Sequence, residues 1–227
     1  MKKIGLIGGM TPESTLYYYR NYIRMSRELL GPFTFPELMI YSINFSEFKD
    51  NPRGWEGRKE LLINAARALE RAGAEIIAMT ANTPHMVFPE VQEAVNVPMV
   101  SIIDTLIEEM KRRRVKKVLL LGTKTTMTAG FYKNALREAG FDVVTPTEEE
   151  MDEVNRVIFE ELSFENLKSK PYLIELVERY AREKGIEGVI LGCTELPLAI
   201  KPGDVPVEVF DTAKIHMKKL IELASGF

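Results

Sequence analysis

Short apolar runs alternate with longer amphipathic stretches along the whole of this 227-residue chain. Alternation of this kind is typical of βαβ units, in which helices cover both faces of a parallel sheet. The apolar runs are nearly continuous, as expected of strands that are buried on both faces. The sequence therefore predicts an α/β fold, with strands near 3–7, 38–42, 75–79, 98–101, 117–121, 141–144, 187–191 and 206–209, and helices near 12–30, 57–72, 85–94, 102–113, 127–138, 147–162, 171–184 and 211–225.

The chain also repeats itself. The stretch GAEIIAMTANTP (73–84) resembles GIEGVILGCTELP (185–197), and each is followed by a Val-Pro strand start and then an Asp-Thr pair. We predict two pseudo-symmetric domains, each with a four-stranded parallel sheet flanked by helices: 1–100 with 210–227, and 101–209. Ligands of parallel α/β sheets bind outside the carboxyl ends of the strands. The prediction therefore places the active site in the interdomain cleft.

The composition of the chain limits the partners, metal sites and disulfides that can be expected. The net charge is −3 with both signs interspersed, which gives no reason to expect nucleic acid or a membrane surface as a partner. No apolar stretch approaches the ~20 residues of a membrane span, and a cytoplasmic protein is expected. The single cysteine excludes an internal disulfide and a cysteine-rich zinc site. His85 and His216 are far apart in sequence and do not indicate a metal site.

The first strand is followed by the loop IGGMTPES, in which Gly8 and Gly9 end the strand. Thr11 can cap the next helix, and Pro12 suits its first position. Such a helix start offers free N–H groups to a carboxylate or phosphate, or the glycines only form a tight turn. The spacing is not G-x-G-x-x-G and the second strand ends at Asn44, so a dinucleotide site is disfavoured.

A second hydroxyl-rich loop, GTKTTMT, follows the strand near 117–121. Thr123, Thr125 and Thr126 either cap a helix or bind an anion. The absence of G-x-x-x-x-G-K-[ST] argues against a nucleoside triphosphatase.

The repeat gives the only cysteine a counterpart. Counting from the first glycine of each unit places Ala81 opposite Cys193 across the predicted cleft, with Thr80 beside Ala81. Asn82-Thr83 corresponds to Thr194-Glu195, polar groups that can hold a small polar ligand. A lone cysteine is either a buried packing residue or, before a helix start that lowers its pKa, a reactive thiol.

Other candidates carry less information. His85 either lines the cleft or has a capping or packing role, and His216 is most simply structural. Lys168, Arg53 and Arg58 lie in or near loops, where each either binds a substrate carboxylate or is a surface charge.

Several ordered motifs resemble the aspartate/glutamate racemase family, in particular its aspartate-racemase branch: IGLIGGMTPEST, ANTPH, LLLGTKTTMTAGFY, IFEEL, NLK, GVILGCTELPL and VFDTAKIH. The resemblance runs nearly end to end. It implies an isomerase that needs no cofactor and no pyridoxal-lysine, built from two α/β domains and commonly homodimeric. In that family two cysteines face each other across the substrate α-carbon, so that one removes the α-proton and the other reprotonates the opposite face.

This sequence departs from the family at one of the two cysteines. The second is present as Cys193, but the position of the first, just before Asn82, is Ala81. Thr80 or a water is then the candidate for the vacant face. The remaining expected substrate contacts are Gly9, Met10, Asn82, Thr83, Thr123, Thr126, Thr194 and Glu195, with Lys168 first and Arg53 second for the side-chain carboxylate.

Three functions stay open at this point. The first is an amino-acid racemase acting on aspartate- or glutamate-like substrates with Cys193 on one face. The second is another carbanion reaction that needs one acid, as in the related arylmalonate decarboxylase. The third is a non-catalytic binder of acidic amino acids.

Overall fold

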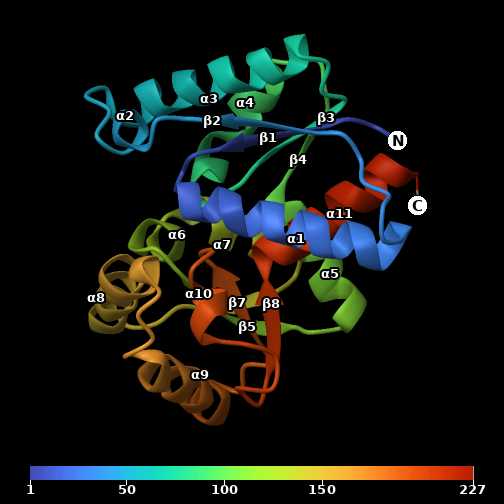
Figure 1. Ribbon diagram of the computed structural model, residues 1–227. Coiled ribbons are helices and arrows are strands. Elements are labelled where there is room, and N and C mark those ends of the chain that lie inside the picture. The colour runs from blue at the N-terminus through green and yellow to red at the C-terminus, as the bar shows by residue number, and fades with distance from the viewer. Residues whose placement is uncertain (227) are drawn as a thin grey trace. The chain divides into compact units, whose positions relative to one another are not determined.

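The structure is a computed structural model that describes residues 1–226. The chain divides into two compact units, Met1–Thr105 with Ala213–Phe227, and Leu106–Thr212 (Figure 1). Two helices carry the chain across the boundaries, α5 (Ile102–Arg113) and α11 (Thr212–Ser225). No helix of the described residues is long and apolar enough to cross a membrane.

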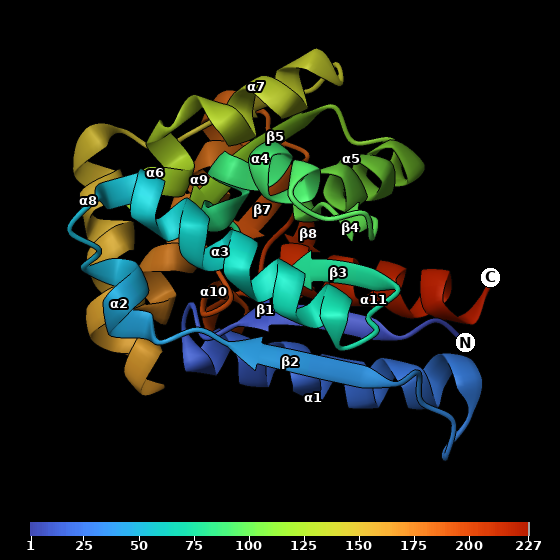
Figure 2. The ribbon, with the colours of Figure 1, turned by 90° about the horizontal axis from the view of Figure 1, so that it is seen from above.

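The first unit contains a four-stranded parallel sheet in the order β2-β1-β3-β4. Its strands are β1 (Ile4–Gly8), β2 (Leu38–Ser42), β3 (Ile76–Met79) and β4 (Met99–Val100). The inner strands β1 and β3 are buried throughout, whereas β2 lies at an edge and is largely exposed (Figure 2). The buried inner strands explain why their sequences are unbroken apolar runs.

Helices cover both faces of this sheet. On one face α3 (Gly54–Arg71) and α4 (Phe88–Glu93) bury an apolar cluster that includes Leu62 and Val91. On the other face α1 (Pro12–Leu30) and α11 bury a second cluster that includes Tyr18 and Met217 (Figure 1). The short helices α2 (Phe45–Lys49) and η1 (Thr83–Val87, a 3-10 helix) follow the carboxyl ends of β2 and β3.

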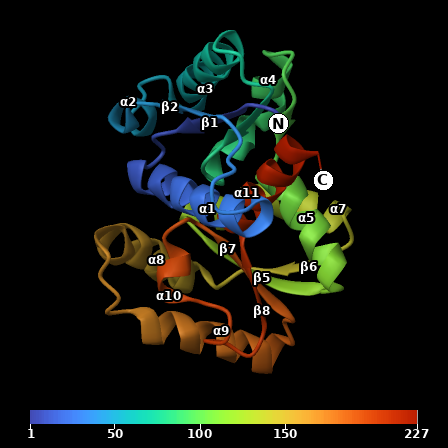
Figure 3. The same cartoon turned by 45° about the vertical axis from the view of Figure 1, so that its right-hand side comes forward.

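The second unit contains a parallel sheet with the equivalent order, β6-β5-β7-β8. Its strands are β5 (Lys117–Gly122), β6 (Asp142–Val144), β7 (Gly188–Gly192) and β8 (Glu208–Asp211). One face is covered by α8 (Glu148–Arg156), α9 (Lys170–Lys184) and α10 (Leu196–Ala199), which share an apolar cluster (Figure 3). The remaining elements are α6 (Lys124–Thr128), α7 (Gly130–Glu138), the π-helix η2 (Val157–Glu161) and the 3-10 helix η3 (Leu162–Phe164).

The two sheets confirm the predicted α/β fold with two four-stranded parallel sheets. Strand register also supports the internal match residue by residue. In the second unit Gly122 pairs with Gly192, and Cys193 is the next residue. In the first unit Ile7 pairs with Met79, so that the step beyond, Gly8 against Thr80, makes Ala81 the equivalent next residue.

Two predicted helices are interrupted in the structure, and two short helices were not predicted. The helix expected over 127–138 is divided into α6 and α7 because Ala129 is extended, with φ −66° and ψ 141°. The helix expected over 147–162 changes to a π-helix at Val157. The helices α2 and α10 were not predicted, since segments of four or five residues are too short to show helical periodicity.

Candidate active site

The loop after β1 has the predicted helix cap. Thr11 is the N-cap of α1, its hydroxyl accepts from Ser14 N at 3.2 Å, and Pro12 opens the helix. Gly9 has φ +83°, and a Cβ there would lie 2.1 Å from the Ile43 carbonyl oxygen. Glycine is therefore required at this position by the close approach of the β2 end, whatever the loop binds.

The Gly9 N–H and the Met10 side chain are both engaged within the first unit. The Gly9 N–H donates to the Thr15 hydroxyl at 2.8 Å. The Met10 side chain is buried in the apolar cluster under α3. Their predicted contact with substrate stays a prediction.

The loop after β3 contains the position of the missing thiol. Ala81 is half-buried and packs against the same apolar cluster as Met10. Thr80 is fully buried, its hydroxyl donates to the Ile7 carbonyl oxygen at 3.2 Å, and its own carbonyl accepts from the Ser14 hydroxyl. In this rotamer Thr80 completes the sheet, and a substrate would reach its hydroxyl only after χ1 rotation.

Asn82 and Thr83 lead into η1 directly after Ala81. Asn82 is buried, and its carbonyl accepts from the His85 N–H at 3.0 Å. Thr83 is half-buried. The loop thus presents polar side chains at the carboxyl end of β3, where the sequence predicts substrate contacts.

His85 holds this loop through both ring nitrogens. Nδ1 lies 2.9 Å from the Ala81 carbonyl oxygen, and Nε2 accepts from the Ile102 N–H at 3.0 Å. A backbone N–H can only donate and a carbonyl can only accept, so the ring is the neutral Nδ1–H tautomer. His85 therefore has a packing role and joins the loop to the start of α5.

His216 is held in the same way. Its Nε2 lies 2.9 Å from the Val100 carbonyl oxygen, and its Nδ1 lies 2.9 Å from the Tyr18 hydroxyl. The carbonyl fixes the Nε2–H tautomer, and Tyr18 therefore donates to Nδ1. Burial lowers the pKa of His216 to about 4, and burial together with His216 lowers that of His85 to about 3.

These two histidines predict acid sensitivity. An unfolded histidine titrates near pH ~6.5, so below that pH the unfolded chain takes up protons that the folded chain rejects until about pH 3 to 4. The free energy of unfolding should then fall with decreasing pH by up to ~1.4 kcal/mol per unit for each histidine. Urea unfolding between pH 7 and about pH 5 measures the slope.

The matched control for this prediction is His216→Gln, which keeps a side-chain donor and cannot titrate. It should be less stable at pH 7 but lose stability less steeply on acidification. An unchanged slope in both His216→Gln and His85→Gln would contradict the assignment.

In the second unit the loop after β5 is capped by Thr123. Its hydroxyl accepts from Thr126 N at 3.3 Å, and it lies 3.1 Å from the Thr126 hydroxyl. Thr126 is fully buried. The capping interpretation of this loop is confirmed, and the predicted anion contact of either hydroxyl stays a prediction.

The loop after β7 contains a thiol and a carboxylate in direct contact. The Cys193 Sγ donates to Glu195 Oε2 at 2.8 Å, and the Thr194 hydroxyl donates to the same oxygen at 3.0 Å. Glu195 is only 7% exposed, whereas Cys193 is half-buried. A buried carboxylate with two donors is thus in direct contact with the thiol of a half-buried cysteine.

The expected lowering of the thiol pKa is wrong in direction. Burial, followed by the charge and hydrogen bond of Glu195, raises the pKa of the Cys193 thiol well above its usual range. The Thr194 and Glu195 N–H groups act in the opposite sense but less strongly. The helix that was expected to lower the pKa begins only at Leu196 and has four residues.

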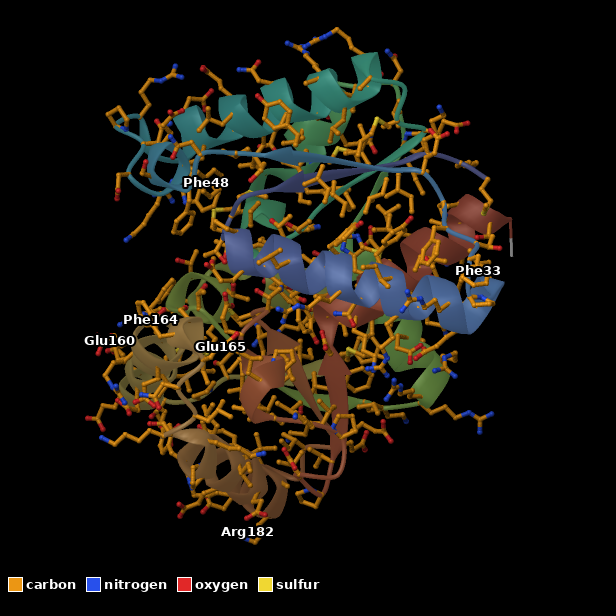
Figure 4. The ribbon with its side chains drawn as sticks, viewed as in Figure 1. Phe33, Phe48, Glu160, Phe164, Glu165 and Arg182 are labelled. Carbon is orange, nitrogen blue, oxygen red and sulfur yellow. The ribbon has the colours of Figure 1, made fainter. Side chains whose placement is uncertain are left out.

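The predicted cations Arg53 and Lys168 are exposed on the surfaces of their own units. Arg53 caps α3 and forms a two-armed ion pair with Glu60 on the surface. Lys168 is exposed in the segment between η3 and α9, close in sequence to Phe164 and Glu165, which are labelled in Figure 4. No ion pair joins Lys168 to another described residue.

The contacts of two side chains, Glu195 and Arg58, were not predicted from the sequence. Glu195 was assigned to substrate, whereas it also contacts the thiol; its position two residues after Cys193 was the available signal. Arg58 was set aside as a weak candidate, although Trp55 three residues earlier on the same helix indicates a shared face. Among the described residues, no group of three or more His, Cys, Asp or Glu side chains could hold a metal ion.

The protein has two parallel α/β units, and a thiol and a carboxylate are in contact at the end of one strand. This arrangement is suited to an enzyme that transfers protons by acid–base chemistry. Residues 7–220 match the model of the Asp/Glu/hydantoin racemase family. The chain belongs to this family.

Solved and curated relatives agree with this assignment. The structure of an aspartate racemase homologue from Pyrococcus horikoshii OT3 is 68% identical, with a TM-score of 0.94, and the match covers 99% of this chain and 100% of that one. The broad specificity amino-acid racemase RacX of Bacillus subtilis is 33% identical over 62% of this chain and 63% of its own. Glutamate racemase of Aquifex pyrophilus is 32% identical over 67% of this chain and 59% of its own. The matches thus span about three fifths of these two curated relatives.

Proposed function

We propose that this protein is an amino-acid racemase-type isomerase that acts on aspartate- or glutamate-like substrates and needs no cofactor. The observation that carries the proposal is the contact between the Cys193 thiol and the buried Glu195 carboxylate at the end of β7. Family membership supplies the reaction class, and this pair supplies a group that can give and take a proton at carbon.

The proton path follows from the raised thiol pKa. At neutral pH the thiol is protonated and is an acid ready to protonate a carbanion. In the reverse direction the thiol proton passes to Glu195, and the thiolate then removes the α-proton from the substrate. One proton moves in each step, and the substrate carbanion is the only other charged species formed.

The opposite face of the carbanion lacks an equivalent group, because the methyl group of Ala81 neither donates nor accepts a proton. We assign that face to a water or, after rotation, to the Thr80 hydroxyl. Inversion should therefore be slower than exchange on the Cys193 face.

Polar groups around the strand ends are assigned to the substrate's α-carboxylate and amino group. These are Asn82 and Thr83 in the first unit and Thr123, Thr126 and Thr194 in the second. Hydrogen bonds to the carboxylate stabilise the carbanion in its enolate form. A homodimer in the cytoplasm is proposed on the family resemblance alone.

Deuterated water tests the proposal. Purified protein incubated with L- or D-aspartate should incorporate deuterium at the α-carbon, and the product should slowly contain the other enantiomer. Saturable binding of aspartate or glutamate with no exchange would instead indicate a binding protein.

One observation favours a second candidate function, a decarboxylase. A thiol with a raised pKa suits a reaction that only has to protonate a carbanion, and decarboxylation generates the carbanion without a base. Carbon dioxide release from a substituted malonate, without α-proton exchange of aspartate, would establish this alternative.

The thiol–carboxylate contact itself predicts a measurable change. Glu195→Gln removes the charge that raises the pKa of Cys193, so the pKa should fall. The rate of iodoacetamide alkylation as a function of pH reports it, since the thiolate is the nucleophile. Glu187→Gln, a surface carboxylate in the same unit, is the control. An equal alkylation profile in wild type and Glu195→Gln would show that the contact has no effect on the thiol.

A further inference from the structure

Two buried histidines meet beside the loop that follows β3. His85 is in η1 and His216 is in α11, and their rings lie edge to face with centres 6.2 Å apart. The Phe88 ring stacks on His85 at 5.3 Å, with only 6° between the two planes. The His85 ring is therefore fixed by packing as well as by the hydrogen bonds of its two nitrogens.

Both histidines bind the short segment between β4 and α5. The His216 Nε2–H donates to the Val100 carbonyl oxygen at 2.9 Å, and the Ile102 N–H donates to His85 Nε2 at 3.0 Å. This segment leads into α5, through which the chain passes into the second unit. His85 thus joins the loop after β3 to the first connection between the units.

At its other end His85 holds two successive carbonyl groups of the loop. Its backbone N–H donates to the Asn82 carbonyl oxygen at 3.0 Å, and its Nδ1–H donates to that of Ala81 at 2.9 Å. In a trans peptide the N–H points opposite to the carbonyl. The N–H groups of Asn82 and Thr83 are therefore directed away from His85, and its bonds set the orientation of both peptides.

The two side-chain bonds of His85 need one donor and one acceptor at a fixed separation, which a neutral imidazole provides. The bond to Ile102 joins two segments of the first unit, as a purely structural histidine would. The bond to Ala81 instead acts on the position that corresponds to Cys193 in the internal repeat. The two bonds can therefore have separate effects, one on stability and one on the loop.

We infer that His85 is a positioning residue for substrate binding, because its bond to the Ala81 carbonyl sets the loop that presents Asn82 and Thr83 to the substrate. This inference rests on the proposed function. His85 does not touch the reacting atoms, and the proposed proton carrier, Cys193, belongs to the other unit. Loss of the bond should consequently weaken substrate binding and leave proton transfer from bound substrate intact.

Two substitutions separate the two bonds. His85→Asn keeps an amide donor near the place of Nδ1 but does not reach Ile102, whereas His85→Gln places an amide oxygen near the place of Nε2 and leaves Ala81 without its donor. His85→Gln should raise the KM for aspartate about tenfold, the value of one hydrogen bond, with the rate of α-proton exchange at saturation unchanged. His85→Asn should restore the wild-type KM although its thermal midpoint is lowered.

Tyr18→Phe is the matched control. It removes the hydroxyl that lies 2.9 Å from His216 Nδ1, in the same buried group of rings but away from the loop. It should lower the thermal midpoint without changing the KM. Equal KM values for folded His85→Asn and His85→Gln would overturn the inference, as would a KM that rises with the loss of thermal stability in all three variants. A lower rate at saturation with an unchanged KM would overturn it too.

Backbone hydrogen exchange tests the loop without any ligand. The amides of Asn82 and η1 should exchange with deuterated water faster in His85→Gln than in His85→Asn, because only the first loses the bond to Ala81. Equal amide exchange in the two variants would overturn the inference. If this difference is found but the wild-type protein does not exchange the α-proton of aspartate, the positioning of the loop by His85 stands and the proposed racemase activity fails.

Discussion

Replacing Cys193 with serine is expected to lower α-proton exchange of aspartate by about 10³-fold. Serine keeps the size of the side chain and its hydrogen bond to Glu195, but a hydroxyl is a far weaker acid than a thiol and is almost never ionised at neutral pH. The loss of the α-proton signal in deuterated water, followed by nuclear magnetic resonance, measures the rate.

Thermal unfolding of the Cys193→Ser protein serves as the control, because it shows whether the variant is still folded. Cys193 is half-buried at the edge of an apolar cluster, so serine there should change the thermal midpoint by only a few degrees, whereas exchange should be nearly lost. Cys193→Ser protein that is folded and exchanges aspartate at the wild-type rate would show that the thiol is a packing residue.

Replacing Ala81 with cysteine is expected to raise racemisation by about 10²-fold. Ala81 and Cys193 are equivalent by strand register, and the sequence predicts that they act on opposite faces of one substrate. A second thiol would then supply the acid or base that the vacant face lacks. The measurement is the rate of change in optical activity starting from each enantiomer.

Two further variants separate the possible reasons for a gain. Ala81→Cys combined with Cys193→Ser should lose the gain, since the added thiol acts only with its partner. Thr80→Val tests whether that hydroxyl serves the vacant face of the unmodified enzyme. A folded Ala81→Cys protein with a reactive new thiol and no faster racemisation would refute the two-face arrangement.

The fold was predictable because its signals are repeated and long. Eight apolar runs alternate with amphipathic stretches, and the repeat of 73–84 in 185–197 predicts two similar units. The strand order within each sheet was not predicted and comes from the structure. The capping roles of Thr11 and Thr123 were also predictable, because a hydroxyl directly before a helix has few other partners.

The chemistry of the site was less predictable because it depends on side-chain direction. The sequence places Glu195 near Cys193 but does not tell whether the carboxylate turns toward the sulfur, and this direction reverses the expected pKa shift. The same limit applies to Thr80, whose hydroxyl turns to the Ile7 carbonyl oxygen within the sheet. Arg53 and Arg58 are alike in sequence, and only their partners, Glu60 and the Trp55 ring, distinguish them.

The central claim is that a single thiol exchanges protons on one face of the substrate. Its most direct test uses the wild-type protein in deuterated water, with L-aspartate in one reaction and D-aspartate in another. The rates of deuterium incorporation at the α-carbon and of inversion are measured in each reaction. We predict that one enantiomer gains deuterium faster than it inverts, and that the other exchanges no faster than it inverts. Equal exchange from both enantiomers, each accompanied by inversion at the same rate, would contradict the claim, because it requires two equally competent proton carriers.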